Sequence, residues 1–159
     1  MELRGHAFVA APRDLVWATV IDPRNVAACA PGIDSIDAVD DRRFRATAKI
    51  KLGFFTVGLT VDLERLETDP PDRVVLSATG RAAGSEIVAR GEIRLSGPSE
   101  GPTEVDCQAT LELSGAVASL GDAVVGPMAS KLVTDGVDCL EARLEAEAGT
   151  TRTGAVDPT

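Results

Sequence analysis

The stretch FRATAKIKL, residues 44–52, alternates apolar and polar side chains almost without a break. A period of two is the pattern of a β-strand with one face buried and the other in water. The buried row of this strand is Phe44, Ala46, Ala48, Ile50 and Leu52. Two of its middle positions carry only a methyl group, where a core is usually widest. The strand therefore raises the question of what fills the space beside Ala46 and Ala48.

The composition is that of one globular domain. The 159 residues are 44% hydrophobic and 26% charged, which suits a single domain with its own core. The 16 Lys and Arg residues against 25 Asp and Glu residues give a formal net charge of -9. This excess of negative charge repels a phosphate backbone and an anionic membrane surface. We therefore expect no nucleic-acid partner.

The first residues, MELRGHAF, lack the basic, apolar and small-residue order of a signal peptide, and the apolar runs are short. We expect neither a signal peptide nor a membrane span. Cys29, Cys107 and Cys139 lie far apart, are odd in number and match no metal-ligand spacing. This pattern favours three buried thiols in a reducing compartment, and hence a cytoplasmic protein.

The first third of the chain predicts one strand and two short helices. Residues 3–10 alternate as a strand, and Pro12 then opens a helix whose apolar residues recur at helical spacing. Asp22 precedes Pro23 and is placed to cap a second helix over residues 23–30. The Pro31-Gly32 pair ends that helix.

The middle of the chain predicts only strands. Alternating runs joined by short turns cover residues 35–39, 44–52, 57–64, 74–80, 87–95 and 105–113. Successive strands with short connections imply an antiparallel meander, curved and covered on one face only.

The last part predicts a long amphipathic helix that covers this sheet. Apolar residues recur at steps of three to five over residues 116–148. Pro127, next to Gly126, should kink or break the helix. Residues 149–159 are polar and lack periodicity, so we expect a single domain over residues 1–148 and a disordered tail.

Small residues gather at the middles of the inward rows. They are Ala46, Ala48, Ala78, Gly80, Ala89, Gly91 and Ala109. Two arrangements of the helix on the sheet would explain such a cluster. Either the helix lies unusually close to the sheet through Gly121, Gly126 and Gly136, which would fill the space as interiors normally do, or a hollow remains that holds a ligand.

The order strand, two helices, six strands, long helix resembles the helix-grip arrangement of START-like and Bet v 1-like carriers, the SRPBCC superfamily. Four motifs resemble one family within it, the CoxG family, which is associated with carbon monoxide dehydrogenase. They are APRDLVW at residues 11–17, DP at 22–23, CAPG at 29–32 and LGDAVV at 120–125. The resemblance covers residues 1–148.

The resemblance implies an α+β helix-grip fold and a non-catalytic accessory role. Proteins of that family are linked to attaching carbon monoxide dehydrogenase to the cytoplasmic membrane, and a lipophilic pocket suits transfer of a quinone. The implied location is the cytoplasm, at the inner face of the cell membrane. Some members carry an extra C-terminal segment that could bind membrane, whereas this sequence ends in GTTRTGAVDPT.

The candidate ligand-binding residues belong to the inward rows and to the long helix. They are Ala46, Ala48, Ile50, Leu52, Phe55, Val57, Leu59, Val61, Leu76, Ala78, Gly80, Ala89, Gly91, Ile93, Ala109, Leu111, Val117, Leu120, Val124 and Met128. Phe54 and Phe55 fall at a strand connection, which predicts a cavity mouth that contacts lipid or a partner. The alternative is that one or both pack under the helix.

Catalytic and metal sites are not predicted. His6 is the single His and, by alternation, points away from the small-residue face, and the chain has no Tyr. Asp14 and Asp22 suit helix starts, and Asp34 and Asp37 suit turns. No nucleophile, base and orienting group converge. Two alternatives to the carrier remain, an adaptor without a ligand and a START-like cyclase or hydrolase.

Overall fold

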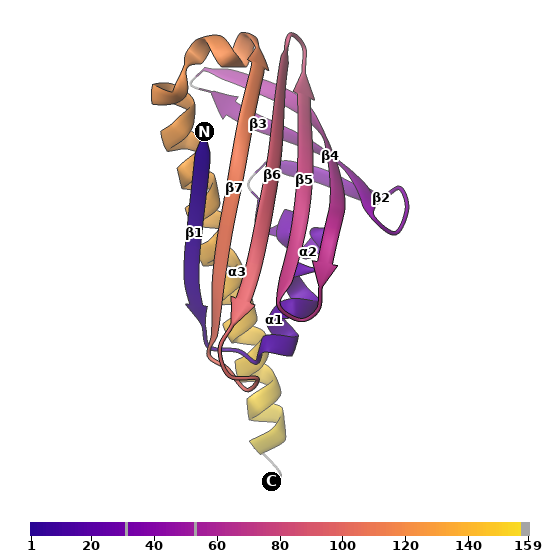
Figure 1. The fold of residues 1–159 in the computed structure, drawn as a ribbon, viewed down its shortest axis with the longest axis vertical. Helices are drawn as coiled ribbons and strands as arrows, with labels where there is room; N and C mark the ends of the chain where they lie inside the picture. Colours follow the sequence, from indigo (N-terminus) through magenta and orange to yellow (C-terminus); the bar gives the residue numbers. More distant parts are fainter. Residues whose placement is uncertain (31, 53, 157–159) are drawn as a thin grey trace.

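The computed structural model describes residues 1–30, 32–52 and 54–156, without the side chains of residues 50–52, 55 and 150–156. A curved antiparallel sheet of seven strands is accompanied by two short helices and one long helix (Figure 1). The elements are β1 (Glu2–Val9), α1 (Arg13–Val20), α2 (Pro23–Ala28), β2 (Ile33–Ala38), β3 (Arg43–Leu52), β4 (Phe55–Asp69), β5 (Arg73–Ala82), β6 (Ser85–Ser96), β7 (Thr103–Gly115), the 3-10 helix η1 (Ala116–Leu120) and α3 (Asp122–Val156).

The strand order is β1-β7-β6-β5-β4-β3-β2. Each strand from β2 to β7 therefore lies beside its neighbour in sequence, and β1 completes the order by pairing with β7. This arrangement confirms the predicted meander and the helix-grip fold. The opening stretch forms β3, in which Ala46 pairs with Val61 and Ala48 with Leu59 of β4.

The two short helices form where the sequence signals predict them. Pro12 precedes α1, with extended backbone that suits the entry to a helix. Asp22 caps α2, since its Oδ1 accepts a hydrogen bond from the backbone N–H of Arg24 at 3.0 Å, and Pro23 occupies the first turn.

The fully buried core lies where α1 meets the C-terminal half of α3 and one end of the sheet. Its members are Ala7, Val9, Ala11, Val16, Val20, Leu95, Val105, Leu144 and Ala148, and Trp17 packs against them. Thr103 is also buried there, and its Oγ1 donates a hydrogen bond to the carbonyl oxygen of Ala11 at 2.9 Å. The hydroxyl is thereby satisfied without water.

The long helix lies along β1, at one side of the sheet (Figure 1). The close approach is made possible by Gly5. A Cβ atom at this position would lie 3.0 Å from Val133 Cγ1 and 3.2 Å from Val137 Cγ2. Contact between α3 and the sheet is therefore tightest at β1. None of the described helices is both long enough and apolar enough to span a bilayer.

The helical region differs from the prediction at both ends. Of the kink or break predicted at Pro127, the break does not occur, because α3 continues through this residue; the interruption lies at Gly121, whose φ of 78° separates η1 from α3. At the other end α3 continues to Val156, through most of the segment predicted to be a disordered tail. A polar sequence can extend an existing helix without packing, because propagation costs less than nucleation.

The cysteine prediction is wrong for two of the three residues. Cys29, after α2, and Cys139, in α3, form a disulfide with their Cα atoms 5.6 Å apart. They are 110 residues apart in sequence, so their proximity depends on α3 passing the C-terminal end of α2 and not on any local spacing. The expected reducing, cytoplasmic compartment therefore no longer follows from the cysteines. Cys107 is free, and burial raises the pKa of its thiol to about 11.

Candidate functional site

The inward rows predicted from alternation lie on one face of one sheet. Across the strands, Leu3 of β1 stands beside Ala109 of β7, Ala109 beside Gly91 of β6, and Gly91 beside Leu76 of β5. This is also the face on which α3 packs, since it contains Gly5. We call it the inner face and the opposite one the outer face.

The long helix does not fill the space above the small residues of the central strands. A Cβ atom at Gly80 would meet Val61 and Ile87, and one at Gly91 would meet Gln108 and Ala109; no described atom of α3 lies within 4 Å of either. The glycines of the helical region, Gly121, Gly126 and Gly136, do not bring α3 to the central strands either. A Cβ atom at Gly126 would lie 4.0 Å from Met1 Sδ and one at Gly136 would lie 4.0 Å from the carbonyl oxygen of Cys29, while one at Gly121 would meet no described atom within 4 Å.

Most predicted lining residues keep part of their surface accessible. Those that are partly exposed are Val57, Leu59, Val61, Leu76, Ala78, Gly80, Ala89, Gly91, Ile93, Ala109, Leu111, Val117 and Met128. Ala46 and Ala48 are buried. The side chains of Ile50, Leu52 and Phe55 lie outside the described residues. Which of these residues contact a ligand stays a prediction.

One stripe of α3 and η1 is apolar and uncovered. Leu120, Val124 and Leu132 are 44%, 49% and 40% exposed. Because successive residues of an α-helix are about 100° apart around the axis, Val124 lies roughly opposite Val133, which packs on β1. Val124 therefore lies on the side of α3 that turns away from β1.

Phe54, between β3 and β4, is fully exposed. It does not pack under the helix, which the sequence left open as an alternative. The side chain of Phe55 lies outside the described residues, so the prediction that both phenylalanines form a mouth stays a prediction for Phe55.

The outer face carries ion pairs that run across the strands. Arg73 of β5 contacts Glu67, Asp69 and Glu92 at 2.8, 2.8 and 2.9 Å, and these carboxylates raise the pKa of its guanidinium. On the same face Asp62 bonds to Arg45 and Arg81, and the hydrogen bond from Arg45 is the main cause that lowers the pKa of Asp62. Because these ion pairs are partly exposed to solvent, each contributes little to the stability of the fold.

A groove of about 250 Å³ also lies on the outer face. Its lining is mostly polar and comes from β1, β5, β6 and β7, including Arg4, Arg73, Arg90, Glu92 and Gln108. It is therefore a different feature from the apolar hollow that the sequence predicts.

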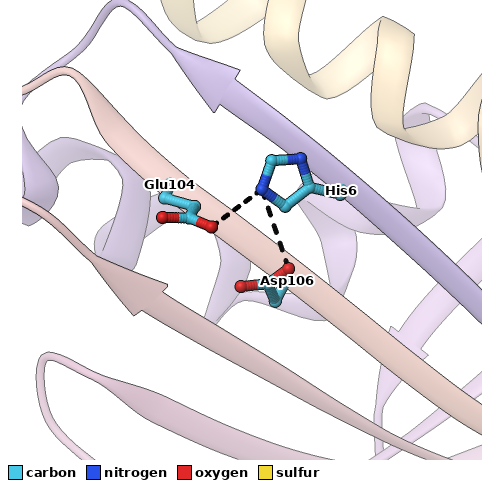
Figure 2. Close-up of side chains that lie close together, drawn as sticks. All are labelled: His6, Glu104 and Asp106. Atoms are coloured by element: carbon cyan, nitrogen blue, oxygen red, sulfur yellow. Dashed lines mark hydrogen bonds and ion pairs between the residues drawn. The ribbon is translucent and has the colours of Figure 1, made fainter.

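His6 belongs to a cluster that the sequence did not reveal. As expected, it points to the outer face, but its Nε2 lies 2.9 Å from Glu104 Oε1 and 3.8 Å from Asp106 Oδ1 of β7 (Figure 2). The signal that could have found the cluster is the pairing of the first predicted strand with the last, which places His6 opposite Asp106.

The four aspartates considered as carboxylate donors do not meet. Asp22 caps α2 and Asp14 lies in the first turn of α1, as expected. Asp34 and Asp37 were predicted in turns but lie within β2, exposed to solvent. No catalytic constellation forms from them.

The fold is shared with solved structures that differ widely in sequence. A conserved protein from Geobacillus kaustophilus has a TM-score of 0.82 at 20% identity, over 91% of this chain and 95% of that chain. A Thermus thermophilus protein has a TM-score of 0.68 at 19% identity, over 93% and 99%. The di-domain ARO/CYC StfQ from the steffimycin biosynthetic pathway has a TM-score of 0.61 at 18% identity, over 91% and 44%. These likenesses show the fold alone.

A comparison with curated proteins found no match. The family of the CoxG subunit of carbon monoxide dehydrogenase matches residues 5–145, from β1 into the C-terminal half of α3. The match thus includes the strands of the inner face and the helix that lies along them. Since it spans most of the sequence, the chain belongs to the CoxG family of carbon monoxide dehydrogenase subunits.

Proposed function

We propose that this protein is a non-catalytic accessory protein that carries a lipophilic molecule, with a quinone as the candidate, on the inner face of its sheet. In the same proposal it links carbon monoxide dehydrogenase to the inner face of the cytoplasmic membrane. One observation carries the ligand proposal: the inner face keeps accessible apolar surface because α3 packs along β1 and not over the central strands.

The chemistry of this surface favours an apolar ligand. Most partly exposed inner-face positions of β4 to β7 are aliphatic residues, alanines and glycines, such as Leu76, Ala89 and Leu111. The exceptions are Arg65, whose guanidinium donates to the backbone carbonyl oxygens of Ile21 and Asp41, and Ser85 and Cys107. Apolar surface taken out of water contributes about 25 cal/mol per Å². A face with so few hydrogen-bonding side chains gives a charged ligand nothing to replace its water.

The membrane part of the proposal rests on exposed apolar side chains and on the family. Phe54 and the stripe of Leu120, Val124 and Leu132 are large hydrophobic residues in water, which often mark a surface for lipid or another molecule. The net charge of -9 makes electrostatic attraction to anionic lipid unfavourable. Membrane contact would therefore be apolar. The dehydrogenase as partner follows from the family alone.

Native mass spectrometry of the protein purified from cells that make the dehydrogenase tests the ligand. The expected result is a population heavier by the mass of one isoprenoid quinone, identified by solvent extraction. Ala89→Trp, on the inner face, should abolish this population because the indole occupies the space. Thr60→Trp, an exposed outer-face position of β4, is the matched control and should retain it.

The ligand proposal fails if the wild-type mass is that of the bare chain, or if the two Trp variants retain ligand equally. An adaptor role without a ligand would replace it if the dehydrogenase still sediments with membranes only when this protein is present.

A further inference from the structure

We propose that His6, Glu104 and Asp106 form a binding site for one divalent transition-metal ion, of the Zn²⁺ class, on the outer face of the sheet. The site is independent of the proposed ligand on the inner face. It uses an imidazole nitrogen and two carboxylate oxygens, a ligand set that suits Zn²⁺ and its neighbours.

The strand pairing brings the three side chains together. His6 of β1 stands directly opposite Asp106 of β7, and Glu104 lies two residues along the same strand, opposite Phe8. Residues two apart on a strand share a face, and directly opposed residues have Cβ atoms about 5 Å apart. The site is therefore fixed by regular sheet and needs no loop.

The distances suit a tetrahedral ion. Glu104 Oε1 and Asp106 Oδ1 lie 2.9 and 3.8 Å from His6 Nε2, and the three ligand atoms lie within 4.8 Å of one another. With metal–ligand bonds of about 2.0–2.2 Å, two ligand atoms of a tetrahedral zinc site are about 3.4 Å apart. The two observed distances bracket this value, so small side-chain rotations convert the cluster into a coordination site.

The imidazole is held in the orientation that such a site needs. Its ring contacts the Phe8 ring edge to face, with centroids 4.9 Å apart and an interplanar angle of 80°. Both carboxylates approach the same ring nitrogen, Nε2 (Figure 2). In the metal-free protein Nε2 therefore donates its proton to Glu104; a metal ion at Nε2 replaces this proton, and the proton of the neutral imidazole then lies on Nδ1.

The surroundings leave the site accessible. The side chains of His6, Glu104 and Asp106 are 45%, 37% and 46% exposed. Arg94 stands opposite Asp106 on β6, but its guanidinium bonds to Glu92. Coordination positions that the three side chains do not fill would go to water or to a side chain of another molecule.

A hydrogen bond between His6 and Glu104 alone also accounts for the shorter distance, and the experiment must separate the two. The single His of this sequence makes this possible. In a ¹⁵N-labelled sample the ring nitrogens of His6 give one set of long-range ¹H–¹⁵N signals. Zinc coordination at Nε2 should shift the Nε2 signal and fix the proton on Nδ1, saturating at one Zn²⁺ per chain by calorimetry.

Variants locate the ligands. His6→Ala and Glu104→Gln should each weaken Zn²⁺ binding at least about tenfold, because even the loss of a group behind a metal ligand costs about 10–100-fold. Glu112→Gln, an outer-face carboxylate further along β7, is the matched control and should bind like the wild type. All are made with Cys107→Ala, so that no free thiol competes for the ion, and circular dichroism confirms folding.

Unchanged His6 ring signals on addition of Zn²⁺ would overturn the site and leave only the hydrogen bond. Equal weakening by Glu104→Gln and Glu112→Gln would also overturn it, since that pattern means diffuse attraction to an acidic surface. If His6→Ala unfolds, the comparison of Zn²⁺ binding by Glu104→Gln and Glu112→Gln still tests the site.

Discussion

At the scale of single residues, the glycines of the inner face have two distinct roles. Gly5 lets α3 approach β1, whereas Gly80 and Gly91 lie where no described atom of α3 is near. Ala46 and Ala48, whose small size is evident in the sequence, are buried within the fold. Small size alone thus does not distinguish a close contact from accessible surface.

Gly5→Val tests the close contact. The added carbons would collide with Val133 and Val137, and overpacking of this kind typically costs about 1–3 kcal/mol. Urea unfolding should show a midpoint lowered accordingly. Gly58→Val is the control, because a Cβ there meets nothing within 4 Å among the described residues and a β-branched residue suits a strand. Equal destabilisation by both variants would contradict the contact.

At the scale of elements, the position of α3 depends on two attachments besides the buried core that Leu144 and Ala148 join. One is the contact of its middle with β1 through Gly5, and the other is the disulfide from Cys139 to Cys29 after α2. The N-terminal part of the helix, with Val124 exposed, lies before both. The first turns of α3 therefore have fewer attachments than the rest of the helix.

Thiol titration tests the second attachment. In denaturant without reductant, one thiol per chain should react, that of Cys107, and with prior reduction all three cysteines should react. Cys29→Ser combined with Cys139→Ser should lower the free energy of unfolding by roughly 2–4 kcal/mol, because the cross-link closes a long loop. Three reactive thiols in the unreduced, freshly purified protein would rule the disulfide out.

At the scale of the whole molecule, the two faces of the sheet have opposite character. The inner face is apolar, and the outer face is crossed by ion pairs that lower the pKa of Asp62, mainly through Arg45, and of Glu92, mainly through Arg94 and then Arg73. A carboxyl group whose pKa is lower in the folded chain stabilises the fold above its unfolded pKa. This contribution is lost as the pH falls through the folded pKa.

The stability should therefore decline at acid pH, below the ordinary Asp value of 3.8. Urea midpoints measured from neutral pH down to below that value should fall, and Asp62→Asn should make the fall shallower because one of the responsible groups is gone. Asp135→Asn, on α3 and paired locally with Lys131, serves as the comparison. An Asp62→Asn profile parallel to the wild type would contradict the role of Asp62.

The sequence predicted the strands well because a period of two depends only on neighbouring residues, as in Phe44 to Ala48. Asp22 and Pro23 likewise placed α2 from local chemistry. What it could not predict depends on contacts between distant residues. His6 and Glu104 are 98 residues apart, and Cys29 meets Cys139 only because α3 passes the C-terminal end of α2. The course of α3 along β1 is likewise a property of packing and not of periodicity.

The strand β2 forms one border of the sheet, where β3 is its single neighbour among the described strands. Such an edge offers unpaired backbone groups to other chains and invites aggregation. β2 is six residues long, carries Asp34 and Asp37 exposed, and has a register irregularity between Ile33 and Ser35. The exposed charges, the short length and the register irregularity each discourage edge-to-edge pairing, so this border should keep neighbouring copies from joining their sheets even at high concentration.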